Sequence, residues 1–178
     1  AAVSKNEMSV GQTAIAMGRT FEKSGPSLSI GIISALNRIW GRAIQTDAKI
    51  SPTNYGGPLI DLRGRVMGVL VPLSPQGQES ELAGSEWYDS GIGFAVPLVD
   101  INARLETLKS GKDLRPGLLG ISLKQGDIYA LPANVAACRA DGPAGIAGIK
   151  TGDEVVEVDG ATVSRQAQLK HLLGAHYA

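Results

Sequence analysis

Several residue types that carry chemistry are scarce in this chain of 178 residues. Its single cysteine, Cys138, excludes an intrachain disulfide, and the apolar run around it predicts a buried structural thiol rather than a nucleophile. The only two histidines, His171 and His176, are five residues apart, which is poor spacing for two ligands on one helical face. We therefore expect no metal site and no cofactor.

Excess charge and long apolar runs are missing as well. Lys and Arg number 17 against 17 Asp and Glu, so the charge gives no reason to expect a nucleic acid or an anionic membrane surface as partner. No segment approaches the roughly 18 consecutive apolar residues of a membrane span, so we expect no transmembrane segment in this chain. No signal peptide is visible, and the residues alone leave the localisation unknown.

Glycine and proline are abundant instead, with 23 and 9 residues, which fits a turn-rich β protein. Short alternating or apolar runs follow one another at 12–17, 28–36, 42–46, 58–62, 66–71 and 91–96. No segment with helical periodicity separates them, so they predict one small closed barrel rather than βαβ units. A polar loop is expected within 72–88. The period then changes, and apolar residues three or four apart over 98–109 predict an amphipathic helix that ends near Gly111.

The segment 46–60 reads T-D-A-K-I-S-P-T-N-Y-G-G-P-L-I. It resembles the nucleophile loop of trypsin-fold serine peptidases of the HtrA/Deg family, T-D-A-x-I-N-P-G-N-S-G-G-x-L. By this resemblance Tyr55 stands at the nucleophile position, Thr53 stands at an oxyanion-hole position, and Asn54 matches. A phenol on a rigid ring does not replace a serine hydroxyl, and a β-branched residue restricts the backbone where a donor must point. We expect a loop whose shape is kept and whose catalytic chemistry is lost.

Further blocks resemble the same family in the same order. Residues 9–18 and 29–36 are similar to its V-G-x-x-V-x-A-I-G and T-x-G-I-V-S-A-L strands, and 91–97 to G-I-G-F-A-I-P. The last block implies that Gly93, Phe94 and Ala95 bind substrate. The family carries its His and Asp in a preceding barrel, and nothing before residue 12 supplies one. We therefore expect that the native N-terminus is absent, and that an apolar face normally covered by a partner barrel is exposed.

The C-terminal third resembles a PDZ domain. Residues 115–121 are similar to the opening R-G-x-L-G-I, and 134–160 to the pattern that ends in G-D-x-I-x-x-V-N-G. Asp159 and Gly160 predict a tight hairpin, and Ser164 predicts the N-cap of a helix over 166–173 that Gly174 ends. A PDZ groove binds an extended peptide as an added strand. The resemblance implies peptide contacts at Leu118, Leu119, Gly120 and Ile121; an ordinary buried strand start is the alternative.

These blocks together predict a mainly β fold. The resemblance implies that residues 1–111 form a six-stranded, trypsin-like C-terminal half-barrel with a closing helix. A linker at 112–116 leads to an α+β PDZ domain over 117–178, which we expect to be truncated because a further strand is missing.

Two functions remain open. The first is a proteolytically inactive HtrA-like serine endopeptidase homologue that binds peptides or the C-termini of unfolded proteins. The alternative is a component or regulatory subunit of an active HtrA-type endopeptidase in protein quality control. The implied partners are a peptide ligand, a second copy of the chain or an active paralogue, and the family resemblance implies a periplasmic or other extracytoplasmic place.

Overall fold

The computed structural model describes residues 1–19, 25–73, 90–115, 117–174 and 176–177. The chain divides into two compact units, Ala1–Lys112 and Asp113–Ala178, and each is described by itself. Most of the polar loop expected within 72–88 lies outside the described residues.

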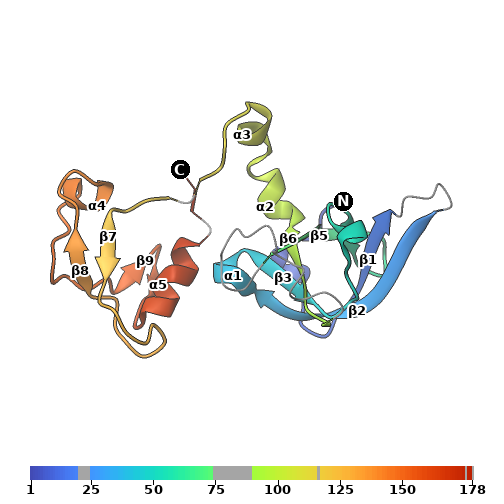
Figure 1. The fold of residues 1–178 in the computed structure, drawn as a ribbon, viewed down its shortest axis with the longest axis horizontal. Coiled ribbons are helices and arrows are strands. Elements are labelled where there is room, and N and C mark those ends of the chain that lie inside the picture. The colour runs from blue at the N-terminus through green and yellow to red at the C-terminus, as the bar shows by residue number, and fades with distance from the viewer. Residues whose placement is uncertain (20–24, 74–89, 116, 175, 178) are drawn as a thin grey trace. The chain divides into compact units, whose positions relative to one another are not determined.

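The first unit is a closed barrel of six antiparallel strands in the order β1-β2-β3-β6-β5-β4 (Figure 1). This confirms the mainly β class and the barrel predicted from the alternating runs. Each strand begins and ends within about two residues of the expected run. The strands are β1 Thr13–Arg19, β2 Pro26–Asn37, β3 Ala43–Thr46, β4 Pro58–Ile60, β5 Val66–Val71 and β6 Gly93–Pro97.

The inner face of the β1–β2 hairpin carries small residues. Ala14 pairs with Gly31 and Ala16 pairs with Ser29, and both alanines are fully buried. A side chain at Gly31 would collide with the backbone of Ala48. The small residues on this face therefore let the loop that follows β3 pass close to the strands. The barrel core is completed by larger side chains from the other strands and from the N-terminal segment: Val3, Met8, Ile33, Ile44, Leu59, Met67 and Leu70.

The outer face of the same strands is apolar, which inverts the usual pattern of a solvent-facing sheet. Ile15 pairs with Ile30 on one side and with Ile60 on the other, and Met17 pairs with Leu28. Ile30 is 71% exposed and Leu28 is 61% exposed. This surface agrees with the exposed apolar face expected of residues 1–111. We call it the outer apolar face, and it consists of Ile15, Met17, Leu28, Ile30, Ile32 and Ile60.

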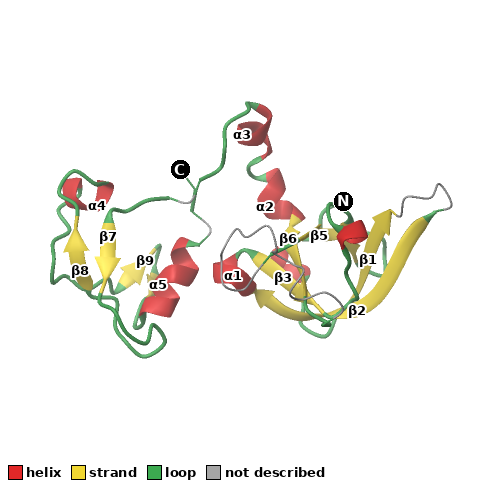
Figure 2. Ribbon diagram, in the orientation of Figure 1, coloured by secondary structure: helices red, strands yellow, loops and turns green. Residues whose placement is uncertain are grey.

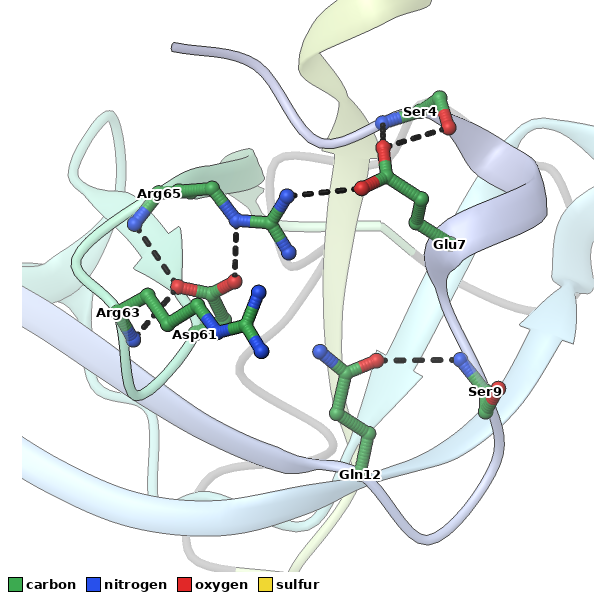
Figure 3. Close-up of polar contacts among 7 residues, drawn as sticks. All are labelled: Ser4, Glu7, Ser9, Gln12, Asp61, Arg63 and Arg65. Atoms are coloured by element: carbon green, nitrogen blue, oxygen red, sulfur yellow. Dashed lines mark hydrogen bonds and ion pairs between the residues drawn. The ribbon is translucent and has the colours of Figure 1, made fainter.

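The N-terminal segment is tied to the β4–β5 turn (Figure 3). Arg65 joins two carboxylates: its Nη1 lies 2.8 Å from Glu7 Oε1, and its Nε lies 2.8 Å from Asp61 Oδ2. Glu7 also accepts hydrogen bonds from the backbone and hydroxyl of Ser4, across the short 3₁₀ helix η1 (Lys5–Glu7). These bonds, with the Arg65 hydrogen bond the strongest, lower the pKa of Glu7 to about 2. The tie holds Val3 in the core, where it is fully buried.

The helix expected over 98–109 is two short helices, α2 (Leu98–Asn102) and α3 (Leu105–Lys109). The break lies at Arg104, whose guanidinium Nη1 donates to the carbonyl of Asp100 at 2.9 Å. The backbone N–H of Arg104 bonds instead to Ile101, three residues back, so the α-helical ladder is interrupted there. The expectation of one continuous helix was wrong for this reason.

The turn between β2 and β3 has a backbone conformation that the sequence did not predict. The segment labelled α1 (Arg38–Gly41) has left-handed backbone at Ile39 (φ 51°) and Trp40 (φ 56°), so it is not a regular helix. Left-handed conformation is unfavourable for a β-branched residue such as isoleucine. Local sequence patterns therefore gave no reason to predict it.

The second unit contains the paired strands β7 (Ile121–Leu123) and β8 (Val135–Cys138), the hairpin β9 (Glu157–Val158) and β10 (Ala161–Thr162), and the helices α4 (Pro143–Ile146) and α5 (Gln166–Leu173), as Figure 2 shows by colour. Asp159 (φ 51°) and Gly160 (φ 79°) form the predicted hairpin turn. A small core holds the unit together: Ala133, Val163 and Leu169 are buried, with Leu123, Val155, Val158, Leu172 and Leu173 packed against them.

Two local expectations in this unit need correction. The N-cap of α5 is Arg165 rather than Ser164, and the Gln168 side chain accepts hydrogen bonds from the backbone N–H groups of both residues. Cys138 is only half-buried rather than buried: it ends a strand in which Ala136 and Ala137 are exposed, and its Sγ lies 3.8 Å from the carbonyl of Arg139.

Candidate functional site

The predicted nucleophile loop is closed on itself by its own polar groups. Pro52–Asn54 form one 3₁₀ turn, η2, with Ser51 at its N-cap. The Asn54 side-chain oxygen accepts the Ser51 N–H at 2.9 Å and the Ser51 hydroxyl at 3.0 Å. The hydroxyls of Ser51 and Thr53 lie 2.7 Å apart. These hydroxyls are therefore engaged with one another inside the loop.

Tyr55 follows this turn and is half-buried. Its backbone N–H donates to the carbonyl of Pro52 at 3.3 Å, so this donor is used within the loop and does not point at a substrate oxyanion. Burial raises the pKa of the Tyr55 phenol, which keeps the group neutral at neutral pH. A neutral phenol is a poor nucleophile.

The loop is held against the barrel by glycines that allow close approach. A side chain at Gly18 in β1 would collide with Asn54 and Thr53, and one at Gly57 would collide with the carbonyl of Met17. Gly56 has φ 80°, a conformation that glycine adopts without strain. Asp47 accepts the N–H of Ile32 at 2.6 Å, so its carboxylate ties this loop to β2.

A hollow of about 620 Å³ opens beside this loop. It is lined by Met17, Gly18, Arg19, Gly25, Pro26, Thr53, Tyr55, Gly56, Gly57 and Pro58. None of these described lining residues carries a carboxylate or an imidazole. Both histidines of the chain belong to the second unit, where His171 is exposed on α5 and His176 Nε2 lies 3.2 Å from Asp159 Oδ2.

The predicted substrate strand is built into the barrel. Phe94 and Ala95 pair with β3 on one side and with β5 on the other, and both are buried. Gly93 pairs with Thr46 and faces Ile50, whose side chain occupies the space a Cβ would take. The backbone of Phe94 and Ala95 is thus engaged in the sheet, and Gly93 is the one of the three that lies at the strand end.

The second unit carries a groove of about 520 Å³ that brings the four predicted peptide-contact residues together. Leu118, Leu119, Gly120 and Ile121 line one side, and α5 lines the other. Leu118 is 70% exposed although it is apolar. Sequence reasoning missed the helix side, which the spacing i, i+3, i+4, i+7 could have indicated: Gln166, Leu169, Lys170 and Leu173.

The loop at the head of this groove is anchored by its carbonyl groups. The Leu119 carbonyl accepts the N–H of Ala144, and the Gly120 carbonyl accepts the N–H of Arg139, each at 2.9 Å. Gly120 has φ 78°, which favours glycine. The N–H groups of Leu118, Leu119 and Gly120 donate no backbone hydrogen bond to any residue that the structure describes. Adjacent backbone donors of this kind can receive an anion such as a carboxylate.

Metal and membrane features were searched for over the described ranges. No three His, Cys, Asp or Glu side chains gather there in a way that could hold an ion. No helix in the same ranges combines the length and apolarity needed to cross a bilayer.

Comparison with known proteins finds a family model that matches part of each unit. Residues 1–69 match the trypsin-like peptidase domain, and residues 117–178 match the PDZ domain. The probable periplasmic serine endoprotease DegP-like of Halomonas elongata is 33% identical over 182 residues, covering 94% of this chain and 36% of the relative. The protein of the same description from Rickettsia conorii is 32% identical, with 94% and 35% covered. The chain thus spans about a third of the length of these curated relatives.

Solved structures of HtrA-type proteases are also similar in fold to this chain. The HtrA-type protease AlgW with tripeptide superimposes with a TM-score of 0.66 at 27% identity, over 95% of this chain and 57% of that chain. The serine endoprotease from Yersinia pestis gives a TM-score of 0.61 at 28% identity, over 95% and 54%. The chain is therefore a homologue of the HtrA/DegP-type serine endoproteases, with trypsin-like peptidase sequence followed by a PDZ domain.

Proposed function

We propose that the chain is a proteolytically inactive HtrA-type homologue that holds peptides, or the C-termini of unfolded proteins, in the groove of its second unit. The observation that carries the binding role is the head of that groove. Three adjacent N–H groups, of Leu118, Leu119 and Gly120, have no backbone acceptor among the described residues, and these three residues line the groove. A terminal carboxylate satisfies such donors, and an extended peptide adds to β7 as a strand.

Inactivity is supported by the first unit. Tyr55 at the nucleophile position is a neutral phenol, and its N–H is bonded to Pro52. The nearby hydroxyls of Ser51 and Thr53 are bonded within the loop. Both histidines of the sequence lie in the second unit, so no imidazole within residues 1–112 can take a proton from these hydroxyls.

A titration with matched peptides tests the binding role. A fluorescent hexapeptide with a free carboxylate and leucine at its last position should bind the full chain saturably, and its C-terminal amide should bind at least tenfold more weakly. Leu119→Glu places a like charge beside the carboxylate and should abolish binding. Ile146→Glu, at a position 78% exposed on α4, should leave it unchanged. Equal affinity for the acid and the amide would refute carboxylate capture.

A second function is favoured by the outer apolar face. Leu28, Ile30 and Ile32 project from β2 into solvent, a surface that monomeric proteins rarely leave uncovered. The chain would then act as a regulatory partner of an active HtrA-type peptidase, docking through this face. Co-purification with such a peptidase and a change in its turnover would support this role. A peptidase whose rate is the same with and without the chain would contradict it.

The curated relatives are named periplasmic endoproteases, so we infer an extracytoplasmic place for the protein that contains this chain. A fusion to a reporter that is active only outside the cytoplasm tests this inference.

A further inference from the structure

One edge of strand β2 in the barrel is only partly covered. β2 has 12 residues, whereas its neighbour β3 has 4 and pairs with it from Ile33 onwards (Figure 1). Asp47, which directly follows β3, covers one further residue by bonding to the N–H and the carbonyl of Ile32. Among the strands of the described ranges, only β1 pairs with residues 26–31, and it lies along the opposite edge.

Two residues of this stretch direct their backbone groups to the uncovered edge. In a strand, the N–H and C=O groups of every second residue point to the same edge. Ile32 bonds to Asp47 on the β3 side, so Leu28 and Ile30 direct their groups to that side as well. No hydrogen bond within the described part of the chain uses these groups. Two donors and two acceptors are therefore available to an added strand.

A groove of about 300 Å³ opens beside this edge. Its lining comes from β2 and from the loop around Tyr55: Ser27, Leu28, Ser29, Lys49, Ile50, Ser51, Thr53 and Asn54. The hydroxyl of Ser27 is buried and has no hydrogen-bond partner among the described residues. Buried hydroxyls are nearly always bonded, so this one indicates that a polar partner is missing from the groove.

The dimensions favour a single extended chain as the occupant. One strand residue fills about 160 Å³, from a rise of about 3.4 Å, a strand spacing of about 4.8 Å and a sheet spacing of about 10 Å. The groove therefore takes about two residues of a strand whose remainder lies along the edge. The adjoining outer apolar face is much smaller than the roughly 20–30 residues that each side of a stable globular interface contributes.

We propose that residues 26–31 receive an extended segment of another polypeptide as an added antiparallel strand. The segment continues the line of β3, which is antiparallel to β2 at the same edge. Its residues opposite Leu28 and Ile30 lie beside the outer apolar face and are therefore apolar. The alternate residues face Ser27, Ser29 and the loop and are therefore small and polar. β2 itself carries no charged residue that would repel such a strand.

Three labelled peptides based on acetyl-Lys-Ile-Ser-Val-Ser-Ile-Lys-amide test the proposal, and their blocked ends exclude carboxylate capture by the second unit. One is unmodified, one is N-methylated at its apolar residues and one is N-methylated at its serines. In antiparallel pairing the residues opposite Leu28 and Ile30 direct their N–H groups to β2. Fluorescence anisotropy with the full chain should show saturable binding of the unmodified peptide and, within threefold, of the serine-methylated one. The peptide methylated at its apolar residues should bind at least tenfold more weakly.

A substitution on the edge tests the same hydrogen bonds from the side of the protein. Leu28→Pro removes an N–H that bonds to nothing in the described ranges, and proline is tolerated at such edge positions. The variant should keep the urea midpoint of the barrel and bind the unmodified peptide at least tenfold more weakly. Leu28→Ala, which keeps the N–H and loses the apolar side chain, should bind it two- to fivefold more weakly. If Leu28→Pro does not fold, the three peptides still decide the question.

Several results would overturn the proposal. Equal affinity for all three peptides would mean that the contact is apolar only, and competition by a free-carboxylate peptide ending in leucine would place it in the second unit. Absence of binding, combined with self-association that Leu28→Pro abolishes, would mean that the edge pairs with a second copy of the chain. This site lies in the first unit, so its failure and the failure of the proposed peptide groove are observed separately.

Discussion

The two units differ in what their key loops do with their own hydrogen-bonding groups. In the barrel, the loop around Tyr55 consumes them: Ser51, Thr53 and Asn54 bond to each other, and the Tyr55 N–H bonds to Pro52. In the second unit, the loop at 118–120 uses its carbonyls for anchoring and leaves its N–H groups without backbone acceptors among the described residues. A loop that satisfies its own donors is a scaffold, whereas one that keeps them open can receive a ligand.

The largest expected effect comes from the core of the barrel, which is separate from the small core of the second unit. Leu59 is fully buried in the barrel core, whereas Leu62, three residues on, is 72% exposed. Leu59→Ala should destabilise the barrel by about 2–5 kcal/mol because it leaves a cavity, and Leu62→Ala should change its stability by less than about 0.5 kcal/mol. Calorimetry should show that the Leu59→Ala loss affects one transition and leaves that of the second unit in place. Loss of both transitions together would show that the units do not fold independently.

The groove depends on one buried amide. Gln166→Ala removes the hydrogen bond to the Lys124 carbonyl and should cost the second unit about 1–3 kcal/mol, with a parallel loss of peptide affinity. Gln125→Ala, which changes an exposed glutamine that also lines the groove, is the matched control and should alter neither. Urea titration and peptide binding on the same preparations check both effects. Full affinity in Gln166→Ala would mean that the groove does not need this anchor.

The outer apolar face should govern association rather than stability. Ile30→Lys should reduce the mass measured by light scattering and the binding of a hydrophobic dye, because it places a charge in the middle of this face. Val156→Lys, at a position 60% exposed in the second unit, should change neither. If the unmodified chain is a monomer that binds no dye, the exposed face has no role in self-association.

The smallest effect concerns the N-terminal tie. The pKa of Glu7 is lowered from 4.5 to about 2, chiefly by its hydrogen bond with Arg65. A carboxylate with a lowered pKa contributes stability above the unfolded pKa, and this contribution is lost as the pH falls from about 4.5 towards 2. Glu7→Gln should therefore lower the urea midpoint slightly at pH 7 and not at all near pH 2. Glu106→Gln, at an exposed carboxylate on α3, is the control, and an equal pH dependence in both variants would contradict the account.

Local pattern was enough to place the strands and several turns. Alternation at 13–19 and 66–71 and the Asp159-Gly160 pair predicted features that depend on neighbouring residues. What it could not supply depends on distant partners. The tie between Glu7 and Arg65 joins residues 58 apart, and the break at Arg104 depends on one side chain turning back to a carbonyl. The loop around Tyr55 was predicted as a retained shape, but its internal bonding required the structure.

The account depends most on the absence of an activated hydroxyl beside Tyr55. The direct measurement is to treat the chain with a fluorophosphonate, which labels base-activated serines, and to determine the intact mass. We predict an unchanged mass, in Tyr55→Ser as well as in the unmodified chain, since a restored hydroxyl would have no histidine within its own unit to activate it. A stoichiometric adduct on Ser51, or on any other hydroxyl of this loop, would contradict the account.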